Sequence, residues 1–264
     1  MNRGISVKGQ KRPALVIFGS QSDASIYERV IARLHAEAVS SVFRICSAHR
    51  SPGYLSEILK NEEYGLVIAG AGLAAHLPGV VASQTIRPVI GVPVSSSLGG
   101  LDALLSIIQM PPGIPVLSVG IDAAEEAARH AALMSRSYDE ICIVTNGLLM
   151  ERFEKARVWL QERNIPHVFS DEPLKEKVNV LAFSLSRPAS FPGELFIIRV
   201  PVLSEGTPED ALLLARTTSE GLFVGLNRVE NAVIAAAQIL SMDGSFDDQH
   251  HQYRKDMEKA IRLL

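Results

Sequence analysis

Three short polar motifs in the first half of the chain contain residues that could do chemistry. Ser47-Ala48-His49-Arg50 places an imidazole directly beside a guanidinium. Arginine is well suited to binding phosphate, and histidine is the side chain that most readily gains or loses a proton near neutral pH. The motif therefore suits proton transfer beside a bound phosphate. An ordinary loop histidine is an equally good interpretation of His49 taken alone.

The motif Gly19-Ser20-Gln21-Ser22-Asp23 combines two hydroxyls and a carboxylate at the start of a predicted helix. The N–H groups of a helix N-terminus carry partial positive charge and suit a phosphate. Asp23 could instead hold the hydroxyls of a sugar. The simpler interpretation is that Ser22 or Asp23 only caps the helix, which is a common use of both residue types.

The third motif, residues 69–79, follows an apolar run and reads Ala-Gly-Ala-Gly-Leu-Ala-Ala-His-Leu-Pro-Gly. Its small residues let a ligand approach the backbone, and His76 falls in the first turn of a predicted helix. The motif loosely fits the dinucleotide fingerprint, but that fingerprint needs an acidic residue about 20 positions on. The chain has Ser95-Ser96-Ser97 there, so we reject this interpretation. A tight crossing of strand and helix would explain the glycines but not His76.

The elements that must position these motifs alternate along the chain. The apolar pattern predicts an α/β fold with a parallel sheet covered on both faces. Such sheets bind ligands beyond the carboxyl ends of their strands, so the three motifs should meet in one crevice. The predicted strands are residues 14–18, 42–46, 66–70, 88–94 and 115–121, and the predicted helices follow Asp23 and span residues 52–62, 74–85, 101–109 and 122–134.

The composition excludes several classes of protein. The 26 basic residues are balanced by 29 acidic ones, which argues against a nucleic-acid surface. No run of about 18 apolar residues suggests a membrane span, and the polar residues 1–13 do not resemble a signal peptide. Cys46 and Cys142 lie in apolar runs, and we expect two buried thiols in a reducing cytoplasm.

Cofactor motifs are missing from the sequence. There is no phosphate-binding loop for ATP, and the seven histidines are scattered without metal-ligand spacing. His250 and His251 stand near Asp247 and Asp248 and could bind a metal weakly, but a solvated polar linker is the favoured interpretation. We therefore expect no metal and no cofactor.

Taken in this order, the three motifs resemble the family of N5-carboxyaminoimidazole ribonucleotide mutases. Gly91-Val92-Pro93-Val94 and residues 109–116 resemble later motifs of the same family, and the resemblance covers about residues 12–135. It implies a flavodoxin-like three-layer fold, assembled as an octamer of single domains. It also implies a purine-biosynthesis reaction that moves a carboxylate from an exocyclic amine to ring carbon 4, without metal, ATP or biotin.

The resemblance also implies a role for each motif. His49 would carry the proton, and His76 would orient the substrate or its carboxylate. The loops 95–100 and 109–113 are candidates to close the site, which must be dry so that carbon dioxide does not escape. The ribose phosphate would lie on Ser20, Ser22, Asp23 and Arg50. The carboxylate and base would lie on Ser47 and the loop Ala69, Gly70, Ala71, Gly72 and Leu73, and the remaining substrate-binding residues would be Gly19, Ala48 and Leu77.

Two other functions stay open at this point. A related carboxylase fixes free carbon dioxide onto aminoimidazole ribonucleotide, and it generally has other residues in place of Ala-Ala-His-Leu-Pro-Gly, which favours the mutase. Leu73 stands where the mutase loop usually has glycine, so the carboxylase remains an alternative. A nucleotide-binding regulatory module without turnover is the second alternative.

The second half of the chain repeats the first at a constant offset. Pro201 stands 108 positions after Pro93, as Gly221 does after Gly113, but the three polar motifs are replaced. We expect two flavodoxin-like domains in tandem: a catalytic domain at 1–136, a degenerate structural repeat at 137–242, and a linker with a C-terminal helix at 243–264. A regulatory pocket in the repeat is the alternative.

The tandem arrangement predicts an assembly. Four chains would supply eight domains, so we expect a homotetramer that mimics the octamer and binds one small ribonucleotide per chain. The polar segment 243–249 is expected to be the linker, and the amphipathic helix at 253–264 is suited to packing on a partner chain.

Overall fold

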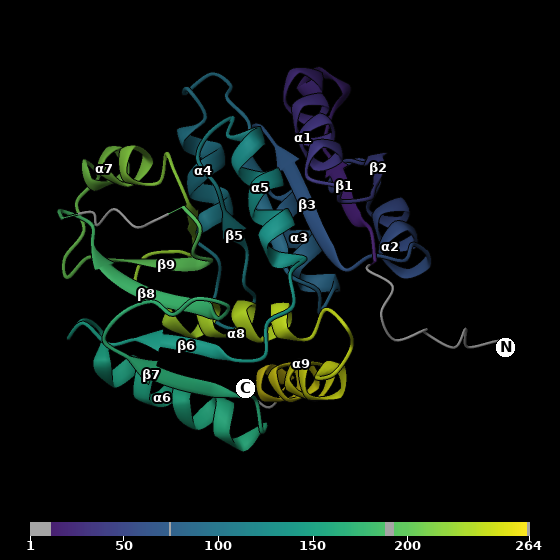
Figure 1. Ribbon diagram of the computed structural model, residues 1–264. Helices are drawn as coiled ribbons and strands as arrows, with labels where there is room; N and C mark the ends of the chain where they lie inside the picture. Colours follow the sequence, from purple (N-terminus) through teal and green to yellow (C-terminus); the bar gives the residue numbers. More distant parts are fainter. Residues whose placement is uncertain (1–11, 74, 188–192, 263–264) are drawn as a thin grey trace, which may run out of the picture.

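The computed structural model describes residues 12–73, 75–187 and 193–262. These residues form an α/β fold around one ten-stranded sheet, with the strand order β2-β1-β3-β4-β5-β10-β9-β8-β6-β7. Figure 1 shows the sheet passing from the first half of the chain into the second, with helices packed along it. Ala74, which belongs to the third motif and to the helix predicted at 74–85, and residues 263–264 of the predicted last helix lie outside the described part.

The first half supplies five strands that are all parallel to their neighbours within it. This confirms the predicted parallel α/β pattern. The strands are β1 (Ala14–Phe18), β2 (Ser41–Ile45), β3 (Leu66–Ala71), β4 (Val89–Pro93) and β5 (Leu117–Ser118). The helices are α1 (Ala24–Ala36), which follows a 3-10 turn η1 (Gln21–Asp23), and α2 (Pro52–Asn61), α3 (Leu77–Gln84), α4 (Leu101–Ile108) and α5 (Ala124–Met134).

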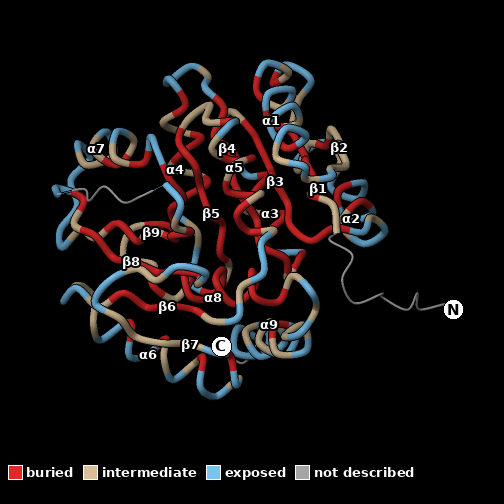
Figure 2. Tube along the Cα trace, viewed as in Figure 1, coloured by how far each residue is buried: buried red, intermediate tan, exposed pale blue. Residues whose placement is uncertain are grey.

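Both faces of this half are buried, as the continuous apolar strands require. Val16 and Phe18 of β1 pack with helices α1 and α5, whereas Leu15 and Ile17 of the same strand pack with α2, α3 and α4. The alternation follows from the two-residue period of a strand. The inner strands are buried and the edge strands β2 and β7 are half-buried (Figure 2).

The second half has the same strand order, read from its own outer edge. It joins the first through one antiparallel pair, Phe223 of β10 opposite Ser118 of β5. The carboxyl ends of the two sets of strands therefore lie at opposite edges of the sheet. Its elements are β6 (Ile141–Val144), α6 (Met150–Glu162), β7 (His167–Ser170), β8 (Val178–Ser184), β9 (Ile197–Val202), α7 (Asp210–Thr217), β10 (Leu222–Phe223), α8 (Val229–Leu240) and α9 (Asp247–Arg262).

Two glycines allow the halves to approach closely beside this pair. A Cβ added to Gly120 would lie 2.7 Å from the carbonyl oxygen of Ser219, and one added to Gly225 would lie 2.5 Å from that of Ile108. Any side chain at either position would push the halves apart. Phe223 and Ile108 belong to the apolar cluster that fills the junction.

Three predicted boundaries are wrong. Helix α3 begins at Leu77 rather than at residue 74, so His76 occupies the N-cap position. Pro78 stands in the first turn of the helix, where a residue without an N–H is well tolerated. Strand β5 comprises only Leu117–Ser118 instead of the seven residues 115–121, and the next element, α5, begins at Ala124. Helix α9 begins at Asp247, inside the segment expected to be a linker.

Helix α9 packs on its own chain, although we expected a surface for a partner chain. Arg87 donates two hydrogen bonds to the Asp247 carboxylate, at 2.7 and 2.5 Å. Arg254 donates to the carbonyl oxygens of Ala82 and Thr85, at 2.9 and 3.3 Å, at the C-terminus of α3. A cation at this end of a helix is favourable because the last carbonyls are unpaired and carry partial negative charge. The last helix therefore ties the second half to the first.

Cys46 and Cys142 are free and buried, as the sequence predicts. In the described ranges, every helix is too short or too polar to cross a membrane.

The buried His250 of α9 predicts an acid-sensitive step in stability. Burial lowers its pKa from 6.5 to about 4. Between these values the unfolded chain binds a proton that the folded chain does not, so stability falls as the pH decreases through this window. The His250 contribution to the loss should be about 3 kcal/mol.

Denaturant unfolding of the wild type and of His250→Gln, from pH 7 to pH 4, measures this contribution. The wild type should lose more stability than the variant across the window. His251→Gln, at the exposed neighbouring position, should behave like the wild type. Parallel losses in the wild type and in His250→Gln would contradict the prediction.

Candidate functional site

A cavity of about 650 Å³ lies at the carboxyl ends of the first-half strands. Segments that follow all five strands, β1 to β5, contribute to its wall. Ser25, Ile26, Ala75, Val94, Ser95, Ser96 and Asp122 line it together with thirteen of the predicted site residues: Gly19, Ser20, Ser22, Asp23, Ser47, Ala48, His49, Arg50, Ala71, Gly72, Leu73, His76 and Leu77.

One wall is built by the turn between β1 and α1. Ser20 Oγ accepts a hydrogen bond from the Ser22 N–H at 3.2 Å and lies 2.8 Å from Ser22 Oγ, which is 3.1 Å from Asp23 Oδ1. Asp23 occupies the N-cap position of α1, but its side chain makes no capping hydrogen bond. The interpretation of Asp23 as a simple cap is therefore wrong, and its carboxylate faces the cavity.

Burial raises the pKa of Asp23, and the nearby negative charge of Asp122 raises it further, while hydrogen bonds from Ser22 and from the Ser20 backbone oppose the increase. A carboxylate in such a position repels an anion and accepts hydrogen bonds from neutral donors such as hydroxyls. This wall therefore suits a sugar better than a phosphate.

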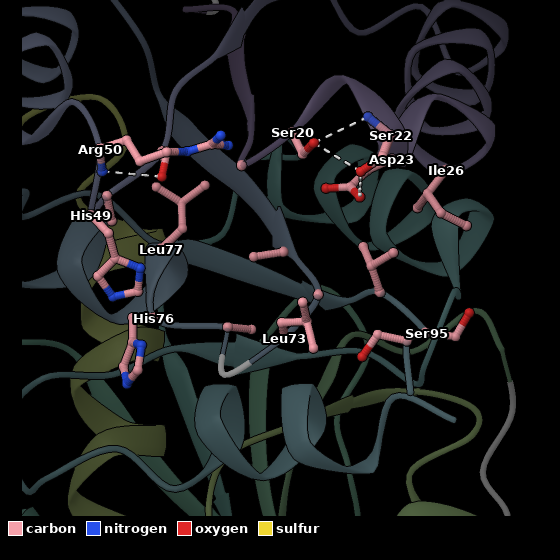
Figure 3. A pocket seen from close by; sticks show the side chains of 18 of the residues that line it. Ser20, Ser22, Asp23, Ile26, His49, Arg50, Leu73, His76, Leu77 and Ser95 are labelled. Atoms are coloured by element: carbon pink, nitrogen blue, oxygen red, sulfur yellow. Dashed lines mark hydrogen bonds between the residues drawn. The ribbon is translucent and has the colours of Figure 1, made fainter. Parts of the chain in front are cut away.

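The opposite wall carries the two histidines. His49 comes from the loop between β2 and α2, and His76 precedes α3, yet their ring centroids are 5.0 Å apart and the rings meet edge to face. Arg50 follows His49, and the backbone N–H of Arg50 donates a hydrogen bond to Ser47 Oγ at 3.3 Å. Figure 3 shows the two imidazoles together on one side of the cavity and Asp23 on the other. All three cationic or titratable side chains of this wall are exposed.

The cavity is therefore polarised. On one side Arg50 offers a positive charge and the two imidazoles offer ring nitrogens, and on the other side Asp23 and Asp122 offer acceptors. Such an arrangement can orient a molecule that has an anionic end and a hydroxyl-bearing end. It also places a proton carrier beside the anionic end.

Two predicted site residues do not reach the cavity. Ala69 and Gly70 lie inside β3, whose residues are buried. A Cβ on Gly70 would lie 2.1 Å from the Phe18 ring, so this glycine makes room for core packing and not for a ligand. Gly72 does line the cavity, and a Cβ there would lie 3.3 Å from the Val94 carbonyl oxygen, so its small size lets the loop pass close to β4.

The two candidate closing loops lie in different places. Ser95 and Ser96, at the start of the first loop, line the cavity. The loop 109–113 follows helix α4, which runs back to the opposite edge of the sheet. There Asn231 of α8 accepts from the Gly113 N–H at 2.8 Å and donates to the Pro111 carbonyl at 3.0 Å. This loop cannot close the cavity of its own chain.

Asp122 is the polar residue that the sequence motifs did not reveal. It follows β5 and its Oδ1 accepts a hydrogen bond from the Ser95 N–H at 2.8 Å. The signal was available, because a carboxylate just after the fifth strand must lie at the same edge as the other motifs. Ser25 and Ile26, in the first turn of α1, could have been inferred in the same way.

Metal binding has no obvious place in the described part of the chain, where no three His, Cys, Asp or Glu side chains are grouped as ligands. His250, named above as a weak metal candidate, is buried within α9.

Comparison with known proteins identifies the family. The model of the AIR carboxylase family matches residues 14–146, which is half of the chain. The N5-carboxyaminoimidazole ribonucleotide mutase of Methanocaldococcus jannaschii is 57% identical over 155 residues, which cover 58% of this chain and 98% of that protein. The mutase of Pyrococcus abyssi is 50% identical over 131 residues, which cover 48% of this chain and 75% of that protein. The chain belongs to the AIR carboxylase family.

Proposed function

We propose that this chain is an N5-carboxyaminoimidazole ribonucleotide mutase, which forms 4-carboxy-5-aminoimidazole ribonucleotide in purine biosynthesis. The observation that carries the proposal is the meeting of thirteen predicted residues in one cavity, with the His49 and His76 rings 5.0 Å apart. Membership of the family and the names of its relatives support the same activity. His49, Arg50 and the serines of the first two motifs would bind and transform the ribonucleotide.

The polarity of the cavity suggests how the substrate lies. Its phosphate and carboxylate would face the Arg50 guanidinium and the Ser47 hydroxyl, since each of these can donate to an anion. Asp23 is better suited to the ribose hydroxyls than to the phosphate, because a buried carboxylate repels an anion. The backbone of the Ala71–Leu73 segment would hold the base and the carboxylate.

The proposed reaction has two steps. First, the N–C bond of the substrate carbamate breaks, carbon dioxide is released within the site, and the exocyclic nitrogen takes a proton from the His49 imidazolium. Ring carbon 4 then attacks carbon dioxide to form the new C–C bond, and neutral His49 removes the proton from that carbon. The imidazolium is restored, so the cycle needs no other proton donor. His76 would orient the carboxylate from the neighbouring position.

Carbon dioxide must stay in the site between the two steps. The cavity wall is open, since His49 and His76 are exposed. Two leucines are also exposed: Leu73, which lines the cavity, by 67%, and Leu98, in the loop that begins at Ser95, by 69%. Closure of this loop, or a neighbouring chain placed against it, would cover apolar surface and exclude water.

An assay without ATP distinguishes the three candidate functions. One reaction contains N5-carboxyaminoimidazole ribonucleotide, and the other contains aminoimidazole ribonucleotide with bicarbonate. Turnover of the carboxylated substrate supports the mutase. Productive reaction of only the second mixture identifies the carboxylase, and binding without turnover in either identifies a regulatory module.

His49→Asn should keep ribonucleotide binding and lose most turnover. Asparagine preserves polarity and approximate size but cannot carry the proton, and a positioned acid–base group contributes about 10²- to 10⁴-fold. Steady-state kinetics measures kcat, and calorimetric titration with aminoimidazole ribonucleotide measures binding. Near-normal kcat in this variant would assign the proton transfer to His76.

We further propose that the second half is a degenerate structural repeat of the first. The boundaries at 1–136, 137–242 and 243–264 follow from this proposal, with the last unit now a helix from Asp247 rather than a linker followed by a shorter helix. Support comes from the shared strand order and from the Methanocaldococcus jannaschii relative, 98% of which is matched by 58% of this chain. The second half also makes hydrogen bonds to the first through Asn231, Arg254 and Asp247. These contacts support a scaffold role for it. Two free thiols, Cys46 and Cys142, support a place in the reducing cytoplasm.

The repeat leads to a prediction about assembly. Four chains should form a homotetramer that mimics an octamer of domains, with one ribonucleotide per chain. The cavity is lined by residues 19–122 of its own chain, so any second-half residue at its mouth would come from a neighbouring chain. Light scattering should give the mass of four chains, and calorimetry should give one site per chain. A mass of eight chains, or two equivalent sites per chain, would contradict the scaffold role.

A further inference from the structure

The same turn follows the fifth strand in both halves. The Asp122 N–H donates to the Pro93 carbonyl at 2.8 Å, and the Asn227 N–H donates to the Pro201 carbonyl at 2.8 Å. Both turn residues have left-handed backbone angles, with φ of 57° and 59°. Aspartate and asparagine tolerate this conformation better than most residues.

The side chains of the two turns also make the same hydrogen bond. Asp122 Oδ1 accepts from the Ser95 N–H at 2.8 Å, and Asn227 Oδ1 accepts from the Leu203 N–H at 3.1 Å. The Asn227 amide additionally donates to the Leu203 carbonyl at 2.7 Å. An amide therefore also holds this turn, which by itself does not require a negative charge at Asp122.

The charge of Asp122 is placed where it is unfavourable for folding. It lies on the same cavity wall as Asp23, whose pKa it helps to raise. Arg29 is near enough to interact with Asp122, but its guanidinium is bound by Glu125 at 2.8 and 2.5 Å. Asparagine would remove the repulsion between the two aspartates and keep the turn. The carboxylate at 122 therefore has a role outside the fold.

We propose that Asp122 is a further substrate-binding residue, which accepts a hydrogen bond from a ribose hydroxyl of the bound ribonucleotide. The inference rests on the proposed function. Oδ1 is engaged by Ser95, and no described residue donates to Oδ2. A ribose offers two neighbouring hydroxyl donors, and this wall offers two carboxylates, Asp23 and Asp122. The anionic groups of the ligand belong on the opposite wall with Arg50, so the hydroxyls are the donors that remain for Asp122.

Asp122→Asn tests the charge separately from the turn. The new amide keeps an oxygen for the Ser95 N–H, as Asn227 does for Leu203, and places a donor where Oδ2 was an acceptor. Calorimetric titrations use aminoimidazole ribonucleotide and its 2′-deoxy and 3′-deoxy forms. The wild type should bind the ribonucleotide about 10- to 100-fold more tightly than the deoxy form that lacks the hydroxyl bound by Asp122. Asp122→Asn should lose this preference, because its affinity for the ribonucleotide falls while its affinity for that deoxy form does not. The thermal midpoint of the variant should match the wild type.

Asn227→Asp is the matched control, because it adds the same charge to the equivalent turn outside the cavity; its ribonucleotide affinity should equal that of the wild type. Asp122→Ser, which keeps an acceptor oxygen but no charge, is the second variant if the asparagine form unfolds. Unchanged discrimination in Asp122→Asn would overturn the inference, as would an equal loss for all three ligands, which would indicate a displaced loop.

Failure of the proposed function would look different. Wild-type protein that binds the ribonucleotide but turns over neither assay mixture would refute the mutase. The loss or retention of ribose discrimination in Asp122→Asn would then still decide the role of Asp122. Wild-type protein that binds none of the three ligands would refute both.

Discussion

The antiparallel contact between Ser118 and Phe223 is the constraint on which the rest of the structure depends. It joins two parallel five-stranded units into one sheet, and it requires the backbone of each half to pass close to the other. Gly120 and Gly225 permit this approach at equivalent places, each against the C-terminal end of a helix from the opposite half. Because both β5 and β10 contain only two residues, the junction depends on these glycines and on the apolar cluster around Phe223 as much as on the strands.

The antiparallel join also decides how the second half can help the first. It turns the second set of strands around, so their carboxyl ends point away from the cavity. The second half then reaches the first at the opposite edge of the sheet, where Asn231 holds the loop after α4 and Arg254 binds the end of α3. Helix α3 connects this support to the site, since His76 stands at its other end. The second half can in this way stabilise a site that it does not line.

Within the cavity, electrostatics separates two kinds of contact. The exposed Arg50, His49 and His76 can meet the anionic and reacting groups of a ligand. The buried Asp23 and the half-buried Asp122 can meet neutral donors. The separation has a local cause. In the turn before α1, the Asp23 side chain makes no capping hydrogen bond and is directed into the cavity. The turn after β5 places Asp122 on the same wall. The two aspartates raise the local negative charge, which is tolerable only where a ligand or a nearby cation compensates for it.

The sequence by itself determined the alternation of strands and helices in the first half and the edge of the sheet where the polar motifs meet, since apolar periodicity and parallel connections are local properties. It could not give the 5.0 Å approach of His49 to His76, or exclude Ala69 and Gly70, because the glycine spacing is the same whether the space is filled by a ligand or by Phe18. The sequence indicated a linker at Asp247 because the segment is polar. Its partner Arg87 is 160 positions away, so the sequence could not show that this carboxylate is paired. The tertiary structure alone decided the single ten-stranded sheet and the acidic wall at Asp122, because both depend on contacts between strand ends that lie far apart in the chain.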